Sequence, residues 1–422
     1  MSSAREKVVV VGQGYVGLPV AMRAVEVGYS VVGIDLDRRR VDALNDASSY
    51  VEDVSDEQIR AALNGGNYQP TDSYEHAQNF DIAVITVPTP LRESQPDLSF
   101  IEQSAKSLAP HLSVGATVIL ESTTYPGTTE ELLVPILESG SGLKVTRDFF
   151  VGYSPERIDP GNTTWGFVDT PKVVSGISPA SLTKVQGFYD RLVQTTVPVS
   201  GTKEAELTKL LENTFRHVNI ALVNELAVFA HRLGVDVWEA IDAASTKPFG
   251  FMRFTPGPGV GGHCLPVDPS YLSWQVRRKL GRSFRFVELA NDINDHMPDY
   301  VVERLILALN RRGLAAKGAR ILLVGLAYKR NSGDTRESPS NRIVELLQEF
   351  GCEVSAVDPH VRGHLWPSTV ARVELTPASL TQFDAAIVVT DHDDVDLTPL
   401  AQSDLAVLDA KNALRSKNVE PL

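Results

Sequence analysis

The start of the chain alternates short apolar runs with one amphipathic segment. Residues 7–11 (KVVVV) and 29–34 (YSVVGI) are apolar and rich in valine, and residues 18–27 between them carry apolar side chains at helical spacing. Short β-branched runs are typical of strands buried on both faces of a parallel sheet, and such strands need a helical crossover between them. The pattern therefore predicts that the chain opens with a doubly wound α/β domain.

Three further apolar runs, at residues 81–87, 116–120 and 149–153, continue the same predicted sheet. Polar or proline residues come soon after each run, with Thr89 after the first and Thr123 after the second. Ligands of open parallel sheets bind beyond the carboxyl ends of the strands. The two threonines are therefore candidates for lining a ligand, although polar residues are also ordinary in turns.

The last third of the chain repeats this order of elements. It predicts a related nucleotide-binding half with a different ligand, because no GxGxxG motif accompanies it. Lys329, Arg330 and Arg336 in its polar loop suit a phosphate. The successive segments are a strand at 320–325, the polar loop at 326–339, a helix at 340–350 and strands at 352–357, 384–389 and 406–408.

Two other polar features of the last third are interpreted as structural. Cys352 comes after a glycine that ends a helix and opens a strand, which is typical of a small core residue. Residues 392–394 (His-Asp-Asp) resemble a metal cluster. Consecutive side chains rarely share one ion, so we expect a solvated turn there and no metal site.

A long helical pattern lies between the two α/β regions. Apolar side chains recur at helical spacing over residues 204–233. This length exceeds that of a crossover helix, so we expect the helix to connect domains or to pack in a dimer. Lys209 and Asn213 lie one turn apart on it, either as a solvated surface pair or as part of a site. Further helices are expected at 237–244 and 291–312.

Together these patterns predict an α/β protein with two Rossmann-like doubly wound domains, joined by a long central helix and a small helical domain. A chain of 422 residues is too long for one hydrophobic core. The expected divisions are residues 1–198 for the first α/β domain, 199–300 for the helical domain and 301–422 for the second α/β domain.

Residues 255–269 (TPGPGVGGHCLPVDP) combine four glycines and four prolines with Cys264, one of only two cysteines in the chain. Glycine permits positive φ and close backbone approach to a ligand, and proline stiffens the segment, so the composition predicts a loop that covers a ligand. A free cysteine is commonly a small core residue. Because Gly-Gly-His-Cys suits neither a core strand nor a core helix, Cys264 is instead a candidate nucleophile.

Composition and charge narrow the function classes. The chain is 43% hydrophobic, which is ordinary for a globular protein, and its formal net charge of −13 argues against binding to the nucleic-acid backbone. Two cysteines cannot build a disulfide framework, and a reactive thiol needs a reducing compartment. No stretch approaches the ~20 apolar residues of a membrane helix, and the N-terminus lacks a signal-peptide pattern. A cytoplasmic protein without nucleic-acid or membrane partners is expected.

A glycine motif connects the first two predicted strands. Gly12, Gly14 and Gly17 form GxGxxG between strand and helix, and Asp35 ends the next strand. In this context the first glycine makes a tight turn, the second admits a pyrophosphate, and the third lets helix and strand pack closely. A carboxylate at Asp35 would bind ribose hydroxyls and repel a 2′-phosphate, which favours NAD over NADP. The basic residues 38–40 could soften that preference.

With these motifs in order, the chain resembles the UDP-sugar 6-dehydrogenases over roughly residues 7 to 415. Within this family it looks most like the UDP-N-acetylglucosamine type. The motifs that carry the resemblance are GQGYVGLP (12–19), VPTPL (87–91), ESTTYPGTT (121–129), YSPERIDPGN (153–162), the Lys209/Asn213 helix, PGPGVGGHCLPVDP (256–269) and GLAYKRNSGDTRESPS (325–340).

The resemblance implies a four-electron oxidation in which a C6 hydroxymethyl becomes a carboxylate and two NAD⁺ are consumed. Cys264 would attack the intermediate aldehyde and carry the thioester. Lys209 and Asn213 would face the oxyanion, and Asp268 would position a proton-accepting water. Glu156 would act as general base in thioester hydrolysis, with Thr123 in the same water network. The residues themselves agree with this chemistry, because successive oxidations at one carbon need a covalent hold that a thiolate provides.

The resemblance also implies contacts with each ligand and a homodimer. NAD would contact Gly12, Gly14, Tyr15, Val16, Gly17, Asp35, Arg40, Thr89, Thr123 and Arg336. The UDP-sugar would contact Glu156, Arg157, Lys209, Asn213, Gly257, Gly259, Gly261, Tyr328 and Lys329.

Some alternatives stay open. Family members often carry Asp-x-Arg near the C-terminus, where this chain has Asp409-Ala-Lys411, so a diphosphate contact there could differ. Residues 247–252 together with 257–269 look most like the UDP-N-acetylglucosamine subgroup, which implies an N-acetylhexosamine (N-acetylglucosamine or an epimer) over glucose. A UDP-glucose 6-dehydrogenase remains the main alternative. A two-electron hydroxyacid dehydrogenase would need no cysteine, and a non-catalytic nucleotide-sugar sensor would need neither Cys264 nor Lys209.

Overall fold

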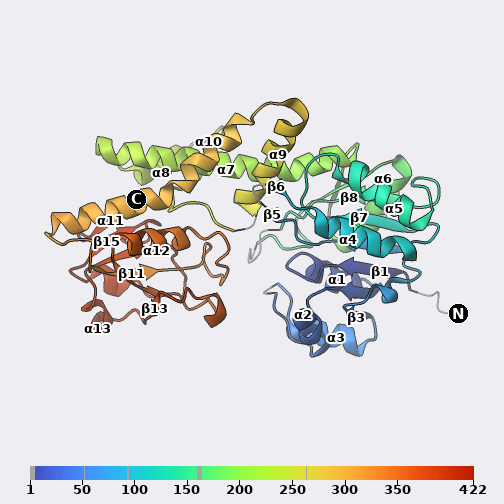
Figure 1. Ribbon diagram of the computed structural model, residues 1–422, viewed down its shortest axis with the longest axis horizontal. Coiled ribbons are helices and arrows are strands. Elements are labelled where there is room, and N and C mark those ends of the chain that lie inside the picture. Colours follow the sequence, from blue (N-terminus) through green and yellow to red (C-terminus); the bar gives the residue numbers. More distant parts are fainter. Residues whose placement is uncertain (1–4, 52, 93–94, 159–163, 263) are drawn as a thin grey trace. The chain divides into compact units, whose positions relative to one another are not determined.

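The computed structural model describes residues 5–51, 53–92, 95–158, 164–262 and 264–422, without the side chains of Cys264 and Pro266. The chain divides into two compact units, Met1–Glu212 and Asn213–Leu422. In Figure 1 the first unit runs from blue to green and the second from green to red. Each unit is a doubly wound α/β structure of the class that the sequence predicts.

The first unit is built on an eight-stranded sheet of order β10-β9-β8-β7-β4-β1-β2-β3. All neighbouring strands are parallel except β8 and β9. The strand order reverses between β1 and β4, which is where doubly wound sheets bind ligands. The strands are β1 (Lys7–Val11), β2 (Ser30–Ile34), β3 (Tyr68–Thr71), β4 (Ile82–Ile85), β7 (Thr117–Leu120), β8 (Phe150–Tyr153), β9 (Lys172–Gly176) and β10 (Thr196–Pro198), with a small hairpin of β5 (Leu91–Arg92) and β6 (Gln95–Pro96).

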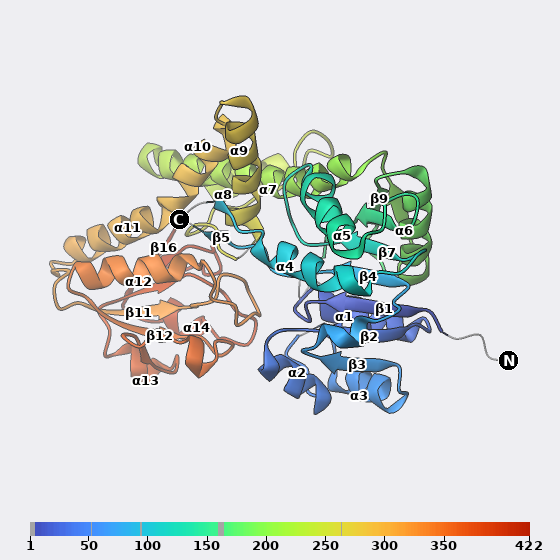
Figure 2. The same cartoon turned by 45° about the vertical axis from the view of Figure 1, so that its right-hand side comes forward.

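Helices cover both faces of this sheet. Apolar side chains of α1, α3 and α6 pack in one core with alternate strand residues. Figure 2 shows α4 and α5 on the opposite face. The helices of this unit are α1 (Gly17–Glu26), α2 (Arg38–Asn45), α3 (Asp56–Asn64), α4 (Ser99–Leu108), α5 (Val134–Ser141), α6 (Pro179–Leu192), short 3₁₀ turns at Tyr74–Ala77 and Ala109–His111, a π-helical turn at Thr129–Leu133, and the start of α7 (Thr202–Leu233).

The second unit contains a six-stranded, wholly parallel sheet of order β13-β12-β11-β14-β15-β16. Its order again reverses beside the first strand in sequence, β11. The strands are β11 (Arg320–Val324), β12 (Glu353–Val357), β13 (Ala371–Arg372), β14 (Ala385–Val388), β15 (Ala406–Asp409) and β16 (Val419–Pro421). Core residues of α11 and α12 cover one face, and those of α13 and α14 cover the other.

The remaining helices of the second unit precede the sheet. α8 packs on the second half of α7 through a small apolar cluster that includes Trp238. The helices are α8 (Val237–Ser245), α9 (Cys264–Leu280), α10 (Arg285–Asp295), α11 (Met297–Arg311), α12 (Pro339–Glu349), α13 (Pro377–Leu380) and α14 (Thr398–Ala401), with a 3₁₀ turn at Gly363–Leu365.

Two expected elements differ from the observed ones. The single helix expected over 291–312 is two helices, α10 and α11, because Pro298 lies in the first turn of α11 and cannot continue α10. The loop expected over 255–269 ends earlier than predicted, since α9 begins at Cys264 and accommodates Pro269 within its length. Cys352 is buried, as the sequence indicates. None of the described helices is long and apolar enough to cross a membrane.

Candidate functional site

The turn between β1 and α1 is shaped by its first and last glycines. Gly12 has a φ of 91°, and a Cβ on Gly17 would lie 1.8 Å from the Gly12 carbonyl oxygen, so side chains are excluded at both positions. A Cβ on Gly14 would meet nothing nearer than Arg40, at 3.8 Å. Packing therefore explains two of the glycines, whereas Gly14 fits the close approach of a bound pyrophosphate.

The helix after this turn is suited to an anion. α1 begins at Gly17 without a capping side chain on Val16 and without an acidic residue in its first turn. Backbone N–H groups at such a helix start, together with the helix dipole, favour a phosphate. Tyr15 is exposed beside the turn. The local geometry thus fits the dinucleotide that the sequence predicts.

Asp35 is fixed at the carboxyl end of β2. Its Oδ2 accepts a hydrogen bond from the Gln13 amide (2.8 Å) and its Oδ1 accepts one from the Asp37 amide (2.9 Å). The Arg40 guanidinium lies 3.2 Å from Oδ2, so the structure brings together two of the predicted NAD residues. A carboxylate can accept about four hydrogen bonds, which leaves Asp35 with capacity for a ribose hydroxyl.

Gln13, Tyr50 and Tyr68 support the same turn, and the sequence did not predict them. Gln13 is fully buried, its Nε2 donates to Val10 O, and its Oε1 accepts from the Tyr68 hydroxyl at 2.7 Å. The Tyr50 hydroxyl donates to Gln13 O at 2.6 Å. Burial raises the pKa of Tyr68, so this tyrosine stays a hydrogen-bond donor. The glutamine within the glycine turn was the one sign of this cluster in the sequence. Its partners Tyr50 and Tyr68 lie far from it along the chain, so the sequence did not reveal them.

Thr89 and Thr123 come after neighbouring strands, β4 and β7. Between these strand ends, the hydroxyl of Ser122 donates to Val87 O at 2.7 Å. Thr89 is buried and Thr123 is half-buried. The two threonines therefore lie after adjacent strands at the ligand edge of the first sheet, as expected. Arg336, the remaining predicted NAD residue, belongs to the second unit, where it forms an ion pair with Asp334.

Glu156 lies just after β8 and has both oxygens engaged. Its Oε1 accepts from the amides of Arg157 and Ile158, each at 2.7 Å, and its Oε2 accepts from Lys172 Nζ at 2.9 Å. Burial alone would raise the pKa of Glu156, but Lys172 and the Ile158 amide outweigh it and lower the pKa. The charge of Lys209 lowers the pKa of Glu156 further. Lys172 was not predicted from the sequence.

Arg157 is occupied by contacts within the first unit. Its guanidinium pairs with Glu212 of α7, with Nε and Nη2 at 3.0 and 2.7 Å from the carboxylate. Its Nη1 also donates to Pro171 O. Arg157 therefore ties the segment after β8 to α7.

Asn213 is held by Asp268. Both side chains are buried, and the Asn213 Nδ2 donates to Asp268 Oδ2 at 2.6 Å. Lys209, one turn earlier in α7, is also buried, which excludes the solvated surface pair considered for these two residues. Asp268 lies in α9, the helix that begins with Cys264. The side chain of Cys264 lies outside the described part of the structure.

The glycine-rich loop before Cys264 packs on other segments of the second unit, to which it belongs. The Gly257 amide donates to Asn224 Oδ1 at 2.9 Å. Gly259 has a φ of 133°, and a Cβ there would lie 3.2 Å from Pro339. A Cβ on Gly261 would lie 2.4 Å from Tyr328 Cβ. Close packing against Tyr328 and Pro339 is therefore one reason for glycines in this loop.

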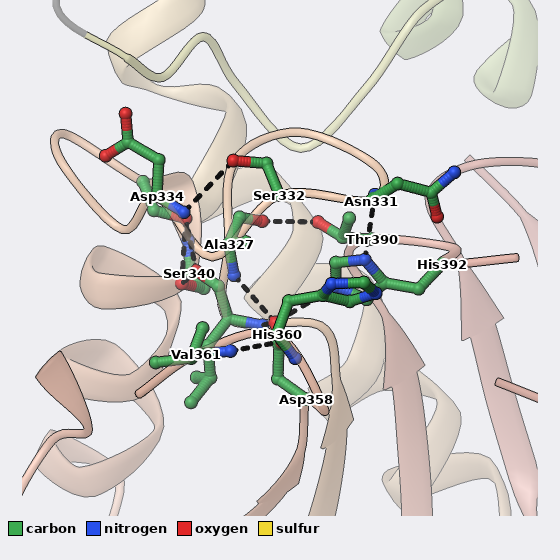
Figure 3. Close-up of polar contacts among 12 residues, drawn as sticks. Ala327, Asn331, Ser332, Asp334, Ser340, Asp358, His360, Val361, Thr390 and His392 are labelled. Atoms are coloured by element: carbon green, nitrogen blue, oxygen red, sulfur yellow. Dashed lines mark hydrogen bonds and ion pairs between the residues drawn. The ribbon is translucent and has the colours of Figure 1, made fainter. Parts of the chain in front are cut away.

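The polar loop after β11 is anchored from β12 and the end of β14 (Figure 3). Asp358 Oδ2 accepts from the amides of Leu326 and Ala327 at 2.8 and 2.9 Å, and its Oδ1 accepts from the amides of His360 and Val361 at 3.0 and 3.1 Å. Burial would raise the pKa of Asp358, but its hydrogen bonds lower it to about 2. Asp358 is thus a fully satisfied carboxylate.

The solvated turn predicted for residues 392–394 is right for Asp393 and Asp394, which lie in an exposed turn, but wrong for His392, which is buried. Figure 3 shows its ring between Asn331 and Asp358. The Asn331 amide donates to Nδ1 at 3.0 Å, so Nε2 carries the proton and donates to Asp358 at 3.1 Å. The neighbouring His360 ring lies against it, with centroids 4.6 Å apart. Among the described residues no group suits a metal ion.

The basic residues of this loop are partly neutralised. Arg330 pairs with Asp391 at 3.2 Å and also with Asp393. Arg336 pairs with Asp334 at 2.6 Å. Two of the three basic residues of this loop, Arg330 and Arg336, are thus paired with carboxylates of the second unit.

A dinucleotide turn in one doubly wound unit and an anchored polar loop in another fit a nucleotide-binding protein. Family models match three successive parts of the chain: the NAD binding domain of the UDP-glucose/GDP-mannose dehydrogenase family at residues 6–193, its central domain at 203–296 and its UDP binding domain at 322–416. The chain therefore belongs to the UDP-glucose/GDP-mannose dehydrogenase family, a family of enzymes, and carries its NAD-binding and UDP-binding domains.

Individual relatives are similar over nearly their whole length. The UDP-N-acetyl-D-glucosamine 6-dehydrogenase of Pseudomonas aeruginosa is 40% identical over 84% of this chain and 83% of its own. The solved UDP-D-ManNAc dehydrogenase of Pyrococcus horikoshii has a TM-score of 0.90 at 33% identity and covers 98% of each chain. A solved UDP-glucose dehydrogenase of Pyrobaculum islandicum has a TM-score of 0.88 at 26% identity, over 100% of this chain and 97% of its own.

Proposed function

We propose that this enzyme oxidises the C6 hydroxymethyl of a UDP-N-acetylhexosamine to the carboxylate in two NAD-dependent steps. The observation that carries the proposal is the buried Asn213–Asp268 hydrogen bond, which fixes polar groups of α7 against the helix that begins with Cys264. Burying a carboxylate costs free energy even when an amide donates to it, and such buried groups concentrate at functional sites. Lys209, buried one turn away on α7, adds a positive charge.

The proposed chemistry balances as RCH₂OH + 2 NAD⁺ + H₂O → RCOO⁻ + 2 NADH + 3 H⁺. NAD, when bound, accepts the hydride of each oxidation. The Cys264 thiolate adds to the aldehyde, forming a C–S bond, and the thioester that results from the second oxidation is hydrolysed by water. Hydrolysis breaks the C–S bond and returns the thiol.

The other side chains act on protons and charge. Asp268 positions the water that takes the proton of the C6 hydroxyl, and Lys209 and Asn213 stabilise the oxyanion; losing one such donor costs on the order of 10²–10³ in rate. Glu156 orients the water that attacks the thioester, with Thr123 in the same network. The predicted NAD and UDP-sugar contacts, and the division at residues 198 and 300, belong to this proposal and are supported by the three matched family segments.

The N-acetylhexosamine is favoured over glucose by the names of relatives. The Pseudomonas aeruginosa and Pyrococcus horikoshii proteins are named for N-acetylated sugars. The fold alone does not discriminate, because a UDP-glucose dehydrogenase is also closely similar in structure.

The test is turnover with a panel of UDP-N-acetylglucosamine, its manno and galacto epimers, and UDP-glucose. We expect two NADH per uronate, with an N-acetylated sugar giving the highest kcat/KM, and we expect the Cys264→Ser variant to form no acid. One NADH per product, or full acid formation by that variant, would favour a two-electron dehydrogenase. Highest kcat/KM with UDP-glucose would favour the alternative substrate.

We also propose a homodimer in a reducing cytoplasm, which a reactive thiol requires. Large apolar side chains are exposed along α7 at helical spacing, which is unusual for a solvated helix face and typical of an interface. They are Leu207, Leu211, Phe215, Leu222, Leu226, Phe229 and Leu233. Light scattering should give twice the chain mass, and Leu226→Glu combined with Phe229→Glu should give monomers.

A further inference from the structure

Three ionisable side chains meet in the interior of the first unit. Lys172 comes from β9, Glu121 lies just after β7 and Glu156 just after β8, which are adjacent strands of one sheet. The side chain of Lys172 is 4% exposed and that of Glu121 is 0% exposed. Lys172 Nζ pairs with both carboxylates. Burying charges costs several kcal/mol for each ion unless they are well paired, so two carboxylates around one ammonium call for a functional reason.

The environment of Glu156 fixes it as an ion in one orientation. Three donors reach its two oxygens, namely two backbone amides and Lys172 Nζ, as described above. Lys209 contributes a second positive charge from α7. The orientation of this carboxylate is thus set by the chain itself, and Lys172 supplies the side-chain donor.

The pKa of Glu121 is shifted in the opposite direction from that of Glu156. Burial raises the pKa of Glu121 in spite of the attraction of Lys172, and the charge of Glu156 raises it further. The Tyr189 ring lies 5.3 Å from Lys172 Nζ, and burial raises the pKa of that tyrosine. Glu121 is therefore the carboxylate that competes with Glu156 for the ammonium of Lys172. The pKa of Lys172 is lowered by burial but raised more by its two partners, so the lysine stays charged.

We infer that Lys172 is a positioning residue of the reaction, which holds Glu156 ionised and aimed at the hydrolytic water, while Glu121 limits how much of the lysine charge Glu156 receives. The inference rests on the proposed function, because it assigns Glu156 to the hydrolysis of a thioester. It adds two residues, one on each neighbouring strand, to the predicted set of site residues.

The test is the pH dependence of kcat in four variants. Lys172→Met should lower kcat by about 10²-fold and move the acidic limb of the profile to higher pH by about one unit, because Glu156 loses its cation. Lys172→Arg should restore the limb. Glu121→Gln should move the limb to lower pH, because Glu156 then has the cation to itself. Lys184→Met, at an exposed lysine of α6, should match the wild-type profile.

The initial burst of NADH should persist in Lys172→Met, because the two oxidations precede hydrolysis, and the affinity for NAD should be unchanged. If the acidic limb of the kcat profile stays at the wild-type pH in both Lys172→Met and Glu121→Gln, the inference is overturned. Lys172 would then have only a structural role. Should Lys172→Met fail to fold, as judged by circular dichroism, Glu121→Gln and Lys172→Arg still decide.

A readout without turnover separates this inference from the proposed function. The infrared carboxylate band of Glu156, identified as a difference against Glu156→Gln, reports its titration directly. A titration that moves to higher pH in Lys172→Met supports the pairing, and one that does not move refutes it. A wild-type chain that makes no NADH with any UDP-sugar would refute the proposed function and leave this titration to decide the pairing.

Discussion

The two doubly wound units share a turn after their first strand. Gly12 and Gly325 come directly after β1 and β11 with the same φ of 91°. A Cβ on either glycine would collide with a threonine at the end of the neighbouring strand, Thr86 or Thr390. Each threonine hydroxyl donates to a carbonyl oxygen of the turn region. The two units therefore share the geometry of this first turn, and they differ in the segments that follow it.

The two units differ in the partners of the carboxylate that follows their second strand, which is Asp35 after β2 and Asp358 after β12. Asp35 receives two backbone hydrogen bonds and lies beside Arg40, so it keeps capacity for a ligand. Asp358 receives four backbone hydrogen bonds and one from buried His392. In the first unit the helix starts at Gly17, directly after the turn, whereas α12 starts only at Pro339. The carboxylate at this position thus keeps hydrogen-bonding capacity in one unit, whereas in the other unit it anchors a long loop.

The largest expected change is the loss of folding stability in the Asp358→Ala variant. The change leaves buried amides and His392 without an acceptor, so we expect a loss of about 3 kcal/mol or more in the free energy of unfolding. Urea denaturation measures it. Asp394→Ala, which removes an exposed partner of His360, is the matched control and should be nearly neutral. Wild-type stability in Asp358→Ala would show that this carboxylate is not a structural anchor.

The next largest expected effect is a loss of folding stability at low pH, when Asp358 becomes protonated. The folded pKa of Asp358, about 2, is below its ordinary value of 3.8. Its contribution is therefore present above about pH 4 and is lost as pH falls through 2. The expected size is about 2 kcal/mol. Unfolding measured from pH 5 to pH 2 should show this loss in the wild type, and the slope should be smaller in Asp358→Asn.

The smallest effect is expected for Asp35→Ala. This change should weaken NAD binding about tenfold, because one hydrogen bond to a charged group is lost, and should cost less stability than Asp358→Ala. Calorimetric titration with NAD and urea denaturation give the two numbers. Asp72→Ala, an exposed aspartate paired with Arg38, serves as control. If Asp35→Ala and Asp358→Ala lose equal stability and Asp35→Ala keeps its NAD affinity, the two carboxylates do not differ in role.

The sequence predicted what depends on local pattern. Strand runs, the glycine turn and Asp35 were identified because their spacing along the chain is fixed by strand and helix geometry. The family of the enzyme was predicted from ordered motifs, and the family models confirm it. The start of α9 was missed because its prolines and the preceding glycines are typical of loops, although proline is tolerated in a first helical turn.

The missed residues depend on long-range geometry. Lys172 meets Glu121 and Glu156 only because β7, β8 and β9 are neighbours in the sheet. His392 meets Asp358 because β14 and β12 flank β11. A lysine at the start of an apolar run and a histidine next to acidic residues carry no local sign of these partners, so only the strand order reveals them.

The burial of Lys172 also makes it a natural chemical probe. Amine-directed reagents acylate lysines that water reaches, and the side chain of this one is 4% exposed between two carboxylates. In the folded enzyme it should therefore escape labelling while surface lysines react. The rate at which label slowly appears at Lys172, monitored by mass spectrometry, would measure how often this part of the first sheet opens to water.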